Sequence, residues 1–238
     1  MTPEPSPAGI QAGPPAGGGG LGRLFAVIPI RSLEGAKSRL GGLLDAEERQ
    51  DLVRLLLERT IAAARATATI ESVVVVSPDP AVLELAGRLG SQPLPQSWPD
   101  HDGGSNRGLN EGLAEAIGSA RSAGADAVLI LPADLPSISP AAIHQVVATA
   151  AAALVPGRPL VVVVPDRHGR GTNALLLLPP DVIRPSFGDE SRLAHQAAAA
   201  RAGALIIELD GPLGLDLDLP ADLSLAEELG LLDPADGG

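Results

Sequence analysis

The stretch 127–136, AVLILPADLP, decides the fold of this chain. Its first five residues are all apolar, which is typical of a strand buried on both faces of a parallel sheet. Asp134 comes just past the carboxyl end of this strand, and Pro132 and Pro136 fix the turn around it. Ligands of open α/β sheets bind outside the carboxyl ends of the strands, so chemistry is expected first at this turn.

Similar apolar segments recur on both sides of this strand, with helical patterns between them. Further strands are expected at 24–30, 71–78, 159–166, 172–179 and 204–209. Helices are expected at 44–66, 80–90, 109–124, 139–154, 191–203 and 220–230. This alternation predicts an α/β fold, in which a single domain has a mostly parallel sheet with helices on both faces.

The ends of the expected helices carry capping signals. Asp45 and Glu48 have the spacing of a capping box at the start of the first helix. Ser139 and Pro140 suit the cap and the first turn of another helix, and Gly90 suits a C-terminal cap.

The domain is expected to span residues 23–233, because no linker interrupts the alternation. Residues 1–22 are rich in proline and glycine and lack the apolar centre of a signal peptide, which predicts a disordered tail. Residues 234–238 are expected to be a flexible C-terminus. The apolar runs are too short to span a bilayer, so we expect no membrane contact and a cytoplasmic location.

The composition excludes several classes of function. The net charge is -12 and only 1% of the residues are aromatic, so neither a basic footprint nor a stacking platform for nucleic acid is present. The absence of cysteine excludes disulfides, thiol catalysis and cysteine-based zinc sites. An acidic protein of this kind can bind a small anion only through a local basic cluster or a divalent cation.

The five residues LPADL occur twice, at 131–135 and at 219–223. In the first copy, Asp134 is either a turn residue that caps its own backbone or a ligand of Mg²⁺. In the second copy, Asp222 falls in the first turn of a helix, where an acid satisfies backbone N–H groups and the helix dipole. We therefore interpret Asp222 as a helix-start residue.

A second candidate for metal binding lies just upstream, in LDLDL. Asp216 and Asp218 occupy alternate positions, which in a strand point to one face. Two like charges on one face repel each other unless a cation or hydrogen-bond donors hold them. The predicted metal ligands are therefore Asp134, Asp216 and Asp218.

The loop after the first strand, in PIRSLEGAKSRL, carries a positive cluster. Lys37 is the only lysine of the chain, and Arg31 and Arg39 stand on either side of it. Such a cluster suits a triphosphate, although a solvated loop with ordinary charges is the alternative. GAKS does not complete the glycine pattern of a phosphate-binding P-loop.

Two further stretches suit an anion. In GRGTNALLL, Thr172 offers a hydroxyl group at the entrance to a strand. In FGDESRLAHQ, Gly188 precedes a helix that has Ser191 near its start, and a helix N-terminus is an anion site. Plain turns or caps are the alternative for both stretches. The histidines show no metal-binding spacing, and His144 and His195 within helices are interpreted as surface or packing residues.

Taken in order, these motifs resemble one family. AVIPIRSLEGAKSRL, GLNEGLAEAI, LPADLP, PDRHGRGTNALLL, FGDES…H and LDLDLPADL follow one another as in the 2-phospho-L-lactate / phosphoenolpyruvate guanylyltransferases of coenzyme F-420 biosynthesis. The resemblance implies a GT-A-like, Rossmann-like nucleotidyltransferase that joins GMP from GTP to a phosphorylated three-carbon acid. PIRS has arginine where many relatives have lysine, and the loop SWPDHDGGSNRG is idiosyncratic, so no guanine contacts are assigned in it.

The resemblance also implies roles for individual residues. Asp134, Asp216 and Asp218 would hold Mg²⁺, with Asp134 and Lys37 in the catalytic centre. Thr172, Gly188 and Ser191 would bind the acceptor phosphate. Arg31, Lys37 and Arg39 would meet the phosphates of GTP, and Asn110 would belong to the nucleotide side.

The residues fit this chemistry, because the acceptor phosphate is ionised near neutral pH and needs no general base. Catalysis then depends on alignment and charge neutralisation. Two alternatives stay open: another nucleotidyltransferase, of the sugar-phosphate or molybdopterin type, and a non-catalytic nucleotide-binding module of the same fold. The acceptor is phosphoenolpyruvate or 2-phospho-L-lactate, and the Ala/Arg-rich, bacterial style of the chain favours phosphoenolpyruvate. A homodimer is compatible with the sequence, although no interface can be read from it.

Overall fold

The computed structural model describes residues 20–34, 36–97 and 106–232. The tail predicted for 1–22 lies outside the described residues except for its last three, among which Leu21 is buried. The C-terminus predicted for 234–238 and most of the loop 97–108 also lie outside them.

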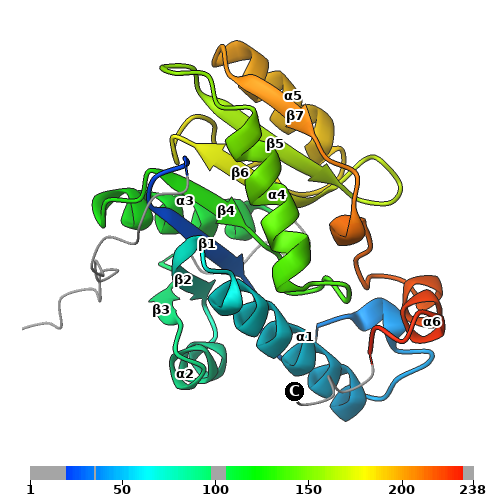
Figure 1. Ribbon diagram of the computed structural model, residues 1–238. Helices are drawn as coiled ribbons and strands as arrows, with labels where there is room; N and C mark the ends of the chain where they lie inside the picture. Colours follow the sequence, from blue (N-terminus) through cyan, green and yellow to red (C-terminus); the bar gives the residue numbers. More distant parts are fainter. Residues whose placement is uncertain (1–19, 35, 98–105, 233–238) are drawn as a thin grey trace, which may run out of the picture.

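The described strands form one seven-stranded sheet, in the order β3-β2-β1-β4-β6-β5-β7 (Figure 1). Neighbouring strands are parallel except at β6, which runs antiparallel to both β4 and β5. The prediction of a mostly parallel sheet in one α/β domain is therefore confirmed. The strands are β1 (Leu24–Pro29), β2 (Ile70–Ser77), β3 (Gln92–Pro95), β4 (Ala127–Ile130), β5 (Leu160–Pro165), β6 (Thr172–Leu178) and β7 (Leu205–Glu208).

The sequence pattern does not predict strand β3, which contains Pro93 and Pro95. Proline has no N–H group to donate to a ladder, so it normally argues against a strand inside a sheet. β3 lies at the edge of the sheet and pairs only with β2, in parallel. Its prolines are tolerated because an edge strand has one unpaired side.

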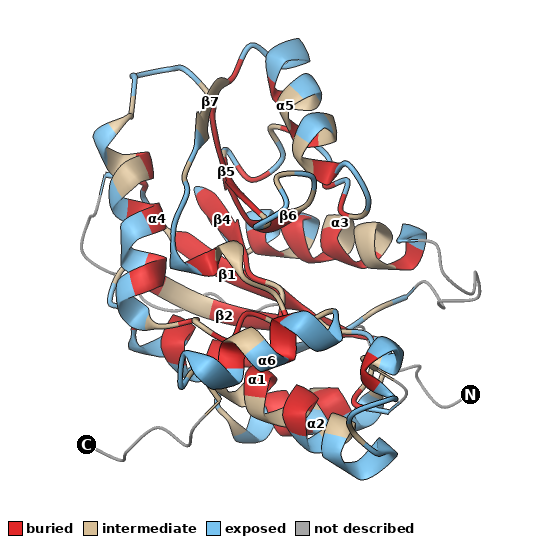
Figure 2. Ribbon diagram, turned by 90° about the vertical axis from the view of Figure 1, so that its right-hand side faces the viewer, coloured by how far each residue is buried: buried red, intermediate tan, exposed pale blue. Residues whose placement is uncertain are grey.

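Helices cover both faces of the sheet, as predicted (Figure 2). One face carries α1, α2 and α4, and the other carries α3 and α5. The helices are α1 (Ala46–Ala66), α2 (Pro80–Arg88), α3 (Arg107–Ser122), α4 (Pro140–Ala152), α5 (Ser191–Arg201) and α6 (Pro220–Glu228), with short 3-10 turns η1 (Ser38–Leu40) and η2 (Pro212–Gly214). Within the described part of the chain, none of these helices combines the length and apolarity needed to cross a membrane.

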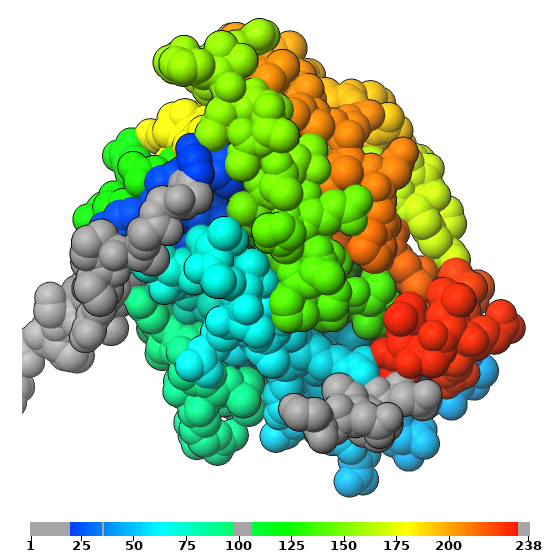
Figure 3. Space-filling model, viewed as in Figure 1, coloured from blue at the N-terminus to red at the C-terminus, as the bar shows by residue number. Residues whose placement is uncertain are grey.

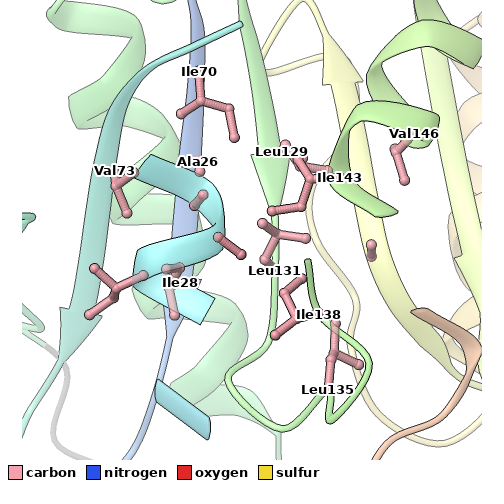
Figure 4. Close-up of a cluster of buried hydrophobic side chains, with 14 of the residues drawn as sticks. Ala26, Ile28, Ile70, Val73, Leu129, Leu131, Leu135, Ile138, Ile143 and Val146 are labelled. Carbon is pink, nitrogen blue, oxygen red and sulfur yellow. The ribbon is translucent and has the colours of Figure 1, made fainter. Parts of the chain in front are cut away.

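The core is built from aliphatic side chains on both faces of β1. Ala26 and Ile28 point into the cluster under α1 and α4, whereas Phe25 and Val27 point into the cluster under α3. All four side chains are fully buried. Figure 4 shows the first cluster, in which β1, β2, β4 and α4 contribute Ala26, Ile28, Ile70, Val73, Leu129, Ile143 and Val146.

The helix-end signals are confirmed. The Asp45 side chain accepts hydrogen bonds from two backbone N–H groups, and Glu48 accepts one from the N–H of Asp45, which completes the capping box. Ser139 caps α4 with Pro140 in its first turn. Gly90 adopts the left-handed conformation just after α2.

After β7 the chain runs along the carboxyl edge of the sheet to reach α6 (Figure 1). Leu217 and Leu223 are buried there in a small cluster with Leu40 of η1 and Leu56 of α1. In Figure 3, α6 (red) accordingly lies against the segment that follows β1 (blue). This packing brings residues 215–218 beside the loops that follow β1 and β4.

Asp222 holds this segment in place. One of its carboxylate oxygens, Oδ2, accepts hydrogen bonds from the N–H of Asp218 at 3.0 Å and of Leu219 at 2.6 Å. The other, Oδ1, forms an ion pair with Arg167 from the loop between β5 and β6. Asp222 is therefore a helix-start residue, as predicted, and it is also buried and tied to a second loop.

Replacing Asp222 by alanine should lower the free energy of unfolding by about 3 kcal/mol, because two N–H groups and a half-buried guanidinium lose their partner. Asp222→Asn should cost roughly half as much, since the amide oxygen still accepts both N–H groups. Urea unfolding of the wild type and both variants measures this. If both variants lost the same free energy of unfolding, the hydrogen bonds at the helix start and the ion pair with Arg167 would not contribute separately as expected.

Candidate active site

Three loops meet at the carboxyl edge of the sheet, and the Lys37 ammonium joins them. Its Nζ atom donates to Oδ2 of Asp134 at 2.9 Å and to Oδ1 of Asp218 at 2.8 Å. The Lys37 side chain is only 11% exposed, so this is a largely desolvated contact. The prediction that Asp134 and Asp218 converge from distant parts of the chain agrees with this geometry.

The backbone supports the position of Lys37. Its φ of 55° lies in the left-handed region, which non-glycine residues seldom adopt. The turn η1 begins directly after it, and buried Leu40 anchors that turn. Burial lowers the pKa of Lys37, but the negative charges of Asp134 and Asp218 outweigh burial and hold the pKa above its ordinary value. Lys37 is therefore a permanent cation in this structure.

Asp216 and Asp218 do not lie in a strand, contrary to the alternation from which they were selected. The segment is extended but joins the sheet region through one described backbone hydrogen bond, from the N–H of Leu217 to the carbonyl of Asp134 at 3.1 Å. The strand is absent because this segment crosses the ends of the strands instead of running beside one. Buried Leu217 still separates the two acidic side chains as a strand residue would.

Asp216 has a different environment from Asp218. Its Oδ1 atom lies 3.4 Å from the Asn173 amide nitrogen, and no ion pair of Asp216 is found among the described residues. Burial, together with the negative charges of Asp134 and Asp218, raises the pKa of Asp216 to about 6, although Asn173 and Lys37 oppose the shift. Negative charge is thus crowded at this point.

The three carboxylates fit Mg²⁺ in type, since hard cations take carboxylate oxygens. Within residues 20–34, 36–97 and 106–232, however, no three acidic or histidine side chains are arranged to hold a metal ion. The Lys37 ammonium lies between Asp134 and Asp218, so a cation already occupies that space. A metal ion at this point would need Lys37 to move.

A cavity of about 540 Å³ opens beside these groups. Its polar rim includes Arg31, Lys37 and Arg39 from the loop after β1, together with Asp134 and Asp218. Leu109 and Phe187 line its apolar side. The predicted phosphate-binding cations therefore lie around one cavity with two of the predicted metal ligands.

β6 brings the GTNA motif to the same edge. Because β6 runs antiparallel to β4, its first residues lie beyond the carboxyl end of β4, as the pairing of Ile130 with Leu175 requires. Neighbouring strand residues point to opposite faces. Thr172 bonds to His195 of α5, whereas Asn173 donates to the carbonyl of Leu213 and approaches Asp216.

His195, interpreted from the sequence as a surface or packing residue, is a packing residue that also makes two hydrogen bonds which the sequence does not predict. It is fully buried, and its Nδ1 atom lies 3.0 Å from Oγ1 of Thr172. Its Nε2 atom accepts the N–H of Ser186 at 2.9 Å. A lone histidine in a helix is typical of a packing residue. Only the place of His195 in FGDES…H indicated a role beyond packing. His144, by contrast, is exposed on α4.

Asn110 supports the FGDES segment. Its Oδ1 accepts the N–H of Phe187 at 2.7 Å, and its Nδ2 donates to the carbonyl of Phe187 at 2.9 Å. Asn110 was expected on the nucleotide side, but here both polar atoms of its amide are bonded to the Phe187 main chain. Its helix α3 thus fixes the residue that lines the cavity.

Gly188 and Ser191 follow directly at the start of α5. Gly188 has a φ of 131°, and a Cβ atom there would lie 2.3 Å from the Asn106 side chain, so glycine is required. Ser191 is buried at the first position of the helix. Thr172 is linked to this segment through His195, which bonds to both Thr172 and Ser186. Phe187, whose ring lies edge-on to His195 with centroids 5.2 Å apart, lines the main cavity, whereas Thr172, Gly188 and Ser191 do not.

Comparison with known proteins identifies the family of this chain. The family model described as "Guanylyl transferase CofC like" matches residues 24–227. The phosphoenolpyruvate guanylyltransferase of Sphaerobacter thermophilus is 43% identical over 200 residues, which cover 84% of this chain and 90% of the relative. That of Rubrobacter xylanophilus is 42% identical over 208 residues, which cover 87% and 95%.

Solved structures share the fold at low sequence identity. A putative nucleotide-diphospho-sugar transferase from Desulfovibrio desulfuricans has a TM-score of 0.67 and 16% identity, covering 88% of each chain. A cytidylyltransferase from Leptospira borgpetersenii has a TM-score of 0.58 and 13% identity, covering 91% of this chain and 90% of that chain. The fold is thus that of nucleotidyltransferases, and on the family match and its relatives the chain belongs to the CofC-like guanylyl transferases.

Proposed function

We propose that the protein transfers the guanylyl group of GTP to the phosphate of phosphoenolpyruvate, with Mg²⁺ and release of pyrophosphate. The observation that carries this proposal is the convergence of Lys37, Asp134 and Asp218 at one cavity. The relatives at 42–43% identity, which are named phosphoenolpyruvate guanylyltransferases, support the choice of donor and acceptor.

The reaction exchanges one P–O bond for another. An oxygen of the acceptor phosphate attacks the α-phosphorus of GTP and forms the new bond. The bond from the α-phosphorus to the oxygen bridging it to the β-phosphate breaks, and that oxygen leaves with pyrophosphate. The acceptor oxygen is already ionised near neutral pH, so no side chain has to remove a proton. Positioning and charge neutralisation are what remain for the protein to supply.

The cationic rim of the cavity suits the triphosphate. Arg31 and Arg39 offer planar forks that match phosphate oxygens, and Lys37 offers a compact point charge. We assign these three residues to the phosphates of GTP. Lys37 changes partners in this assignment, from the carboxylates of Asp134 and Asp218 to a phosphate.

Asp134, Asp216 and Asp218 would hold Mg²⁺ once Lys37 has turned to the nucleotide. The bound ion would neutralise charge on the phosphate oxygens during transfer. The fit rests on the donor set, which consists of carboxylate oxygens with one amide, Asn173, behind Asp216. Leu217 fixes the spacing of the two aspartates on either side of it through its bond to the Asp134 carbonyl.

The acceptor is assigned to the group formed by Thr172, Gly188 and Ser191. The hydroxyl groups of Thr172 at the start of β6 and of Ser191 at the start of α5 suit a phosphate. Phosphoenolpyruvate is favoured over 2-phospho-L-lactate by the printed names of the relatives. Membership in the family supports a role in the assembly of coenzyme F-420, where either acceptor would serve.

The direct test is release of pyrophosphate from GTP and Mg²⁺ with each acid in turn. We expect turnover with phosphoenolpyruvate, at least about tenfold lower kcat/KM with 2-phospho-L-lactate, and loss of turnover after chelation that added Mg²⁺ restores. If pyrophosphate were released with neither acid, the proposed function would be wrong. If activity survived complete chelation, the proposed requirement for Mg²⁺ would be wrong.

Asp134→Asn should lower kcat by at least about a hundredfold, because the amide keeps the shape of the side chain but not its charge. The fold should be unchanged, since the bond from Leu217 uses the Asp134 carbonyl and not its side chain. Steady-state kinetics with circular dichroism measures both. Asp51→Asn, an exposed acid on α1, is the matched control and should behave like the wild type.

Lys37→Met should lower kcat/KM for GTP roughly 10- to 100-fold, the equivalent of a lost hydrogen bond to a charged group. Without nucleotide, Mg²⁺ should raise the melting temperature of this variant more than that of the wild type, because the ammonium no longer competes for Asp134 and Asp218. Arg88→Met, on the surface of α2, is the control. Unchanged kinetics would limit Lys37 to a structural ion pair with Asp134 and Asp218.

A further inference from the structure

His195 occupies a position between the two halves of the acceptor group. Its ring reaches Thr172 at the start of β6 through Nδ1 and Ser186 through Nε2. The same ring packs edge-on against Phe187. No other histidine of the described residues is buried.

The partners of the ring fix the position of its proton. The Ser186 backbone N–H is a donor, so Nε2 must be the unprotonated nitrogen that accepts it. The neutral ring therefore carries its proton on Nδ1 and donates it to Oγ1 of Thr172. Burial lowers the pKa of His195 to about 4, in accord with a neutral ring at physiological pH.

This tautomer also fixes the direction of the Thr172 hydroxyl. Because Oγ1 already accepts a hydrogen bond from Nδ1–H of His195, the hydroxyl hydrogen of Thr172 has to point to another acceptor. A phosphate oxygen beside Thr172 is such an acceptor. Both nitrogens of the ring are in use, so the ring cannot take a proton from a substrate and still keep its two contacts.

We propose that His195 is the positioning residue of the acceptor site: its Nδ1–H orients the Thr172 hydroxyl toward the acceptor phosphate, and its Nε2 fixes the Ser186–Phe187 main chain. The inference rests on the proposed function, since it takes the acceptor phosphate to bind at Thr172. It adds a residue that acts through others and does not touch the reacting atoms.

Two substitutions separate the two contacts of the ring. The amide of glutamine reaches the place of Nε2, so His195→Gln keeps an acceptor for the N–H of Ser186 and removes the donor to Thr172. The amide of asparagine reaches only the place of Nδ1, so His195→Asn keeps that donor and releases Ser186. His144→Gln, at an exposed site on α4, is the matched control.

For His195→Gln we expect the KM for phosphoenolpyruvate to rise about tenfold, with the KM for GTP and kcat little changed, because one oriented hydrogen bond is lost. Thr172→Val should raise the KM for phosphoenolpyruvate to a similar extent. Thr172→Ser, which keeps a hydroxyl group, should leave this KM close to that of the wild type. In the Thr172→Val background, His195→Gln should add no further rise, since the hydroxyl group that it orients is gone.

A spectroscopic readout tests the same bond without turnover. In ¹⁵N-labelled full-length protein near neutral pH, the ring signals that disappear in His195→Gln should be those of a neutral Nδ1–H tautomer. In Thr172→Val, which leaves His195 in place, the Nδ1 signal should shift. The measurement on Thr172→Val tests the hydrogen bond from His195 to Thr172 even if a His195 variant fails to fold.

Additive effects of the two substitutions, an equal rise in the KM for GTP, or an Nε2–H tautomer would each overturn the role of His195 in an active enzyme. A wild-type protein that releases no pyrophosphate with either acid would instead overturn the proposed function and the acceptor role of His195 with it. The two failures are thus distinguishable.

Discussion

The direction of one strand determines where the chemistry of this protein can occur. β6 runs antiparallel between β4 and β5, so it begins at the edge where its neighbours end. Were β6 parallel to them, Thr172 and Asn173 would start at the opposite edge of the sheet, away from Asp134. The reversal places one of these side chains toward α5 and the other toward Asp216, and so joins the acceptor group to the acidic segment through two consecutive residues.

The second constraint is electrostatic. In the proposed reaction, a chain with a net charge of -12 brings two phosphate compounds together beside Asp134, Asp216 and Asp218. In the structure, Lys37 balances two of these carboxylates, while burial and the negative charges of Asp134 and Asp218 raise the pKa of Asp216. In the proposed reaction, Lys37 passes to the nucleotide and another cation takes its place beside the carboxylates.

The sequence was sufficient for the elements and for the residue types of the site. The helices and all strands but β3 follow from apolar periodicity, and β3 was missed because prolines hide an edge strand. The direction of β6 has a signal that was not used: the loop 166–171 is shorter than the dozen or so residues that a parallel crossover needs. The contacts of Lys37, Asn110 and His195 could not be predicted, because they join residues of different segments between 9 and 181 positions apart, and no local pattern records them.

The contacts of the site also explain why neither Lys37 nor His195 is assigned a role in proton transfer. Lys37 keeps its proton because two carboxylates surround it, and His195 stays neutral because it is buried with both nitrogens bonded. Neither residue can exchange a proton near neutral pH without breaking contacts that hold a loop. A transfer between an ionised phosphate and GTP requires no such exchange, so selection can fix both side chains for position alone. In the proposed reaction, catalysis is therefore sensitive to geometry. A shift at Asn110, Phe187 or Asp222 would reach the substrates through main-chain hydrogen bonds, and no proton transfer would compensate for it.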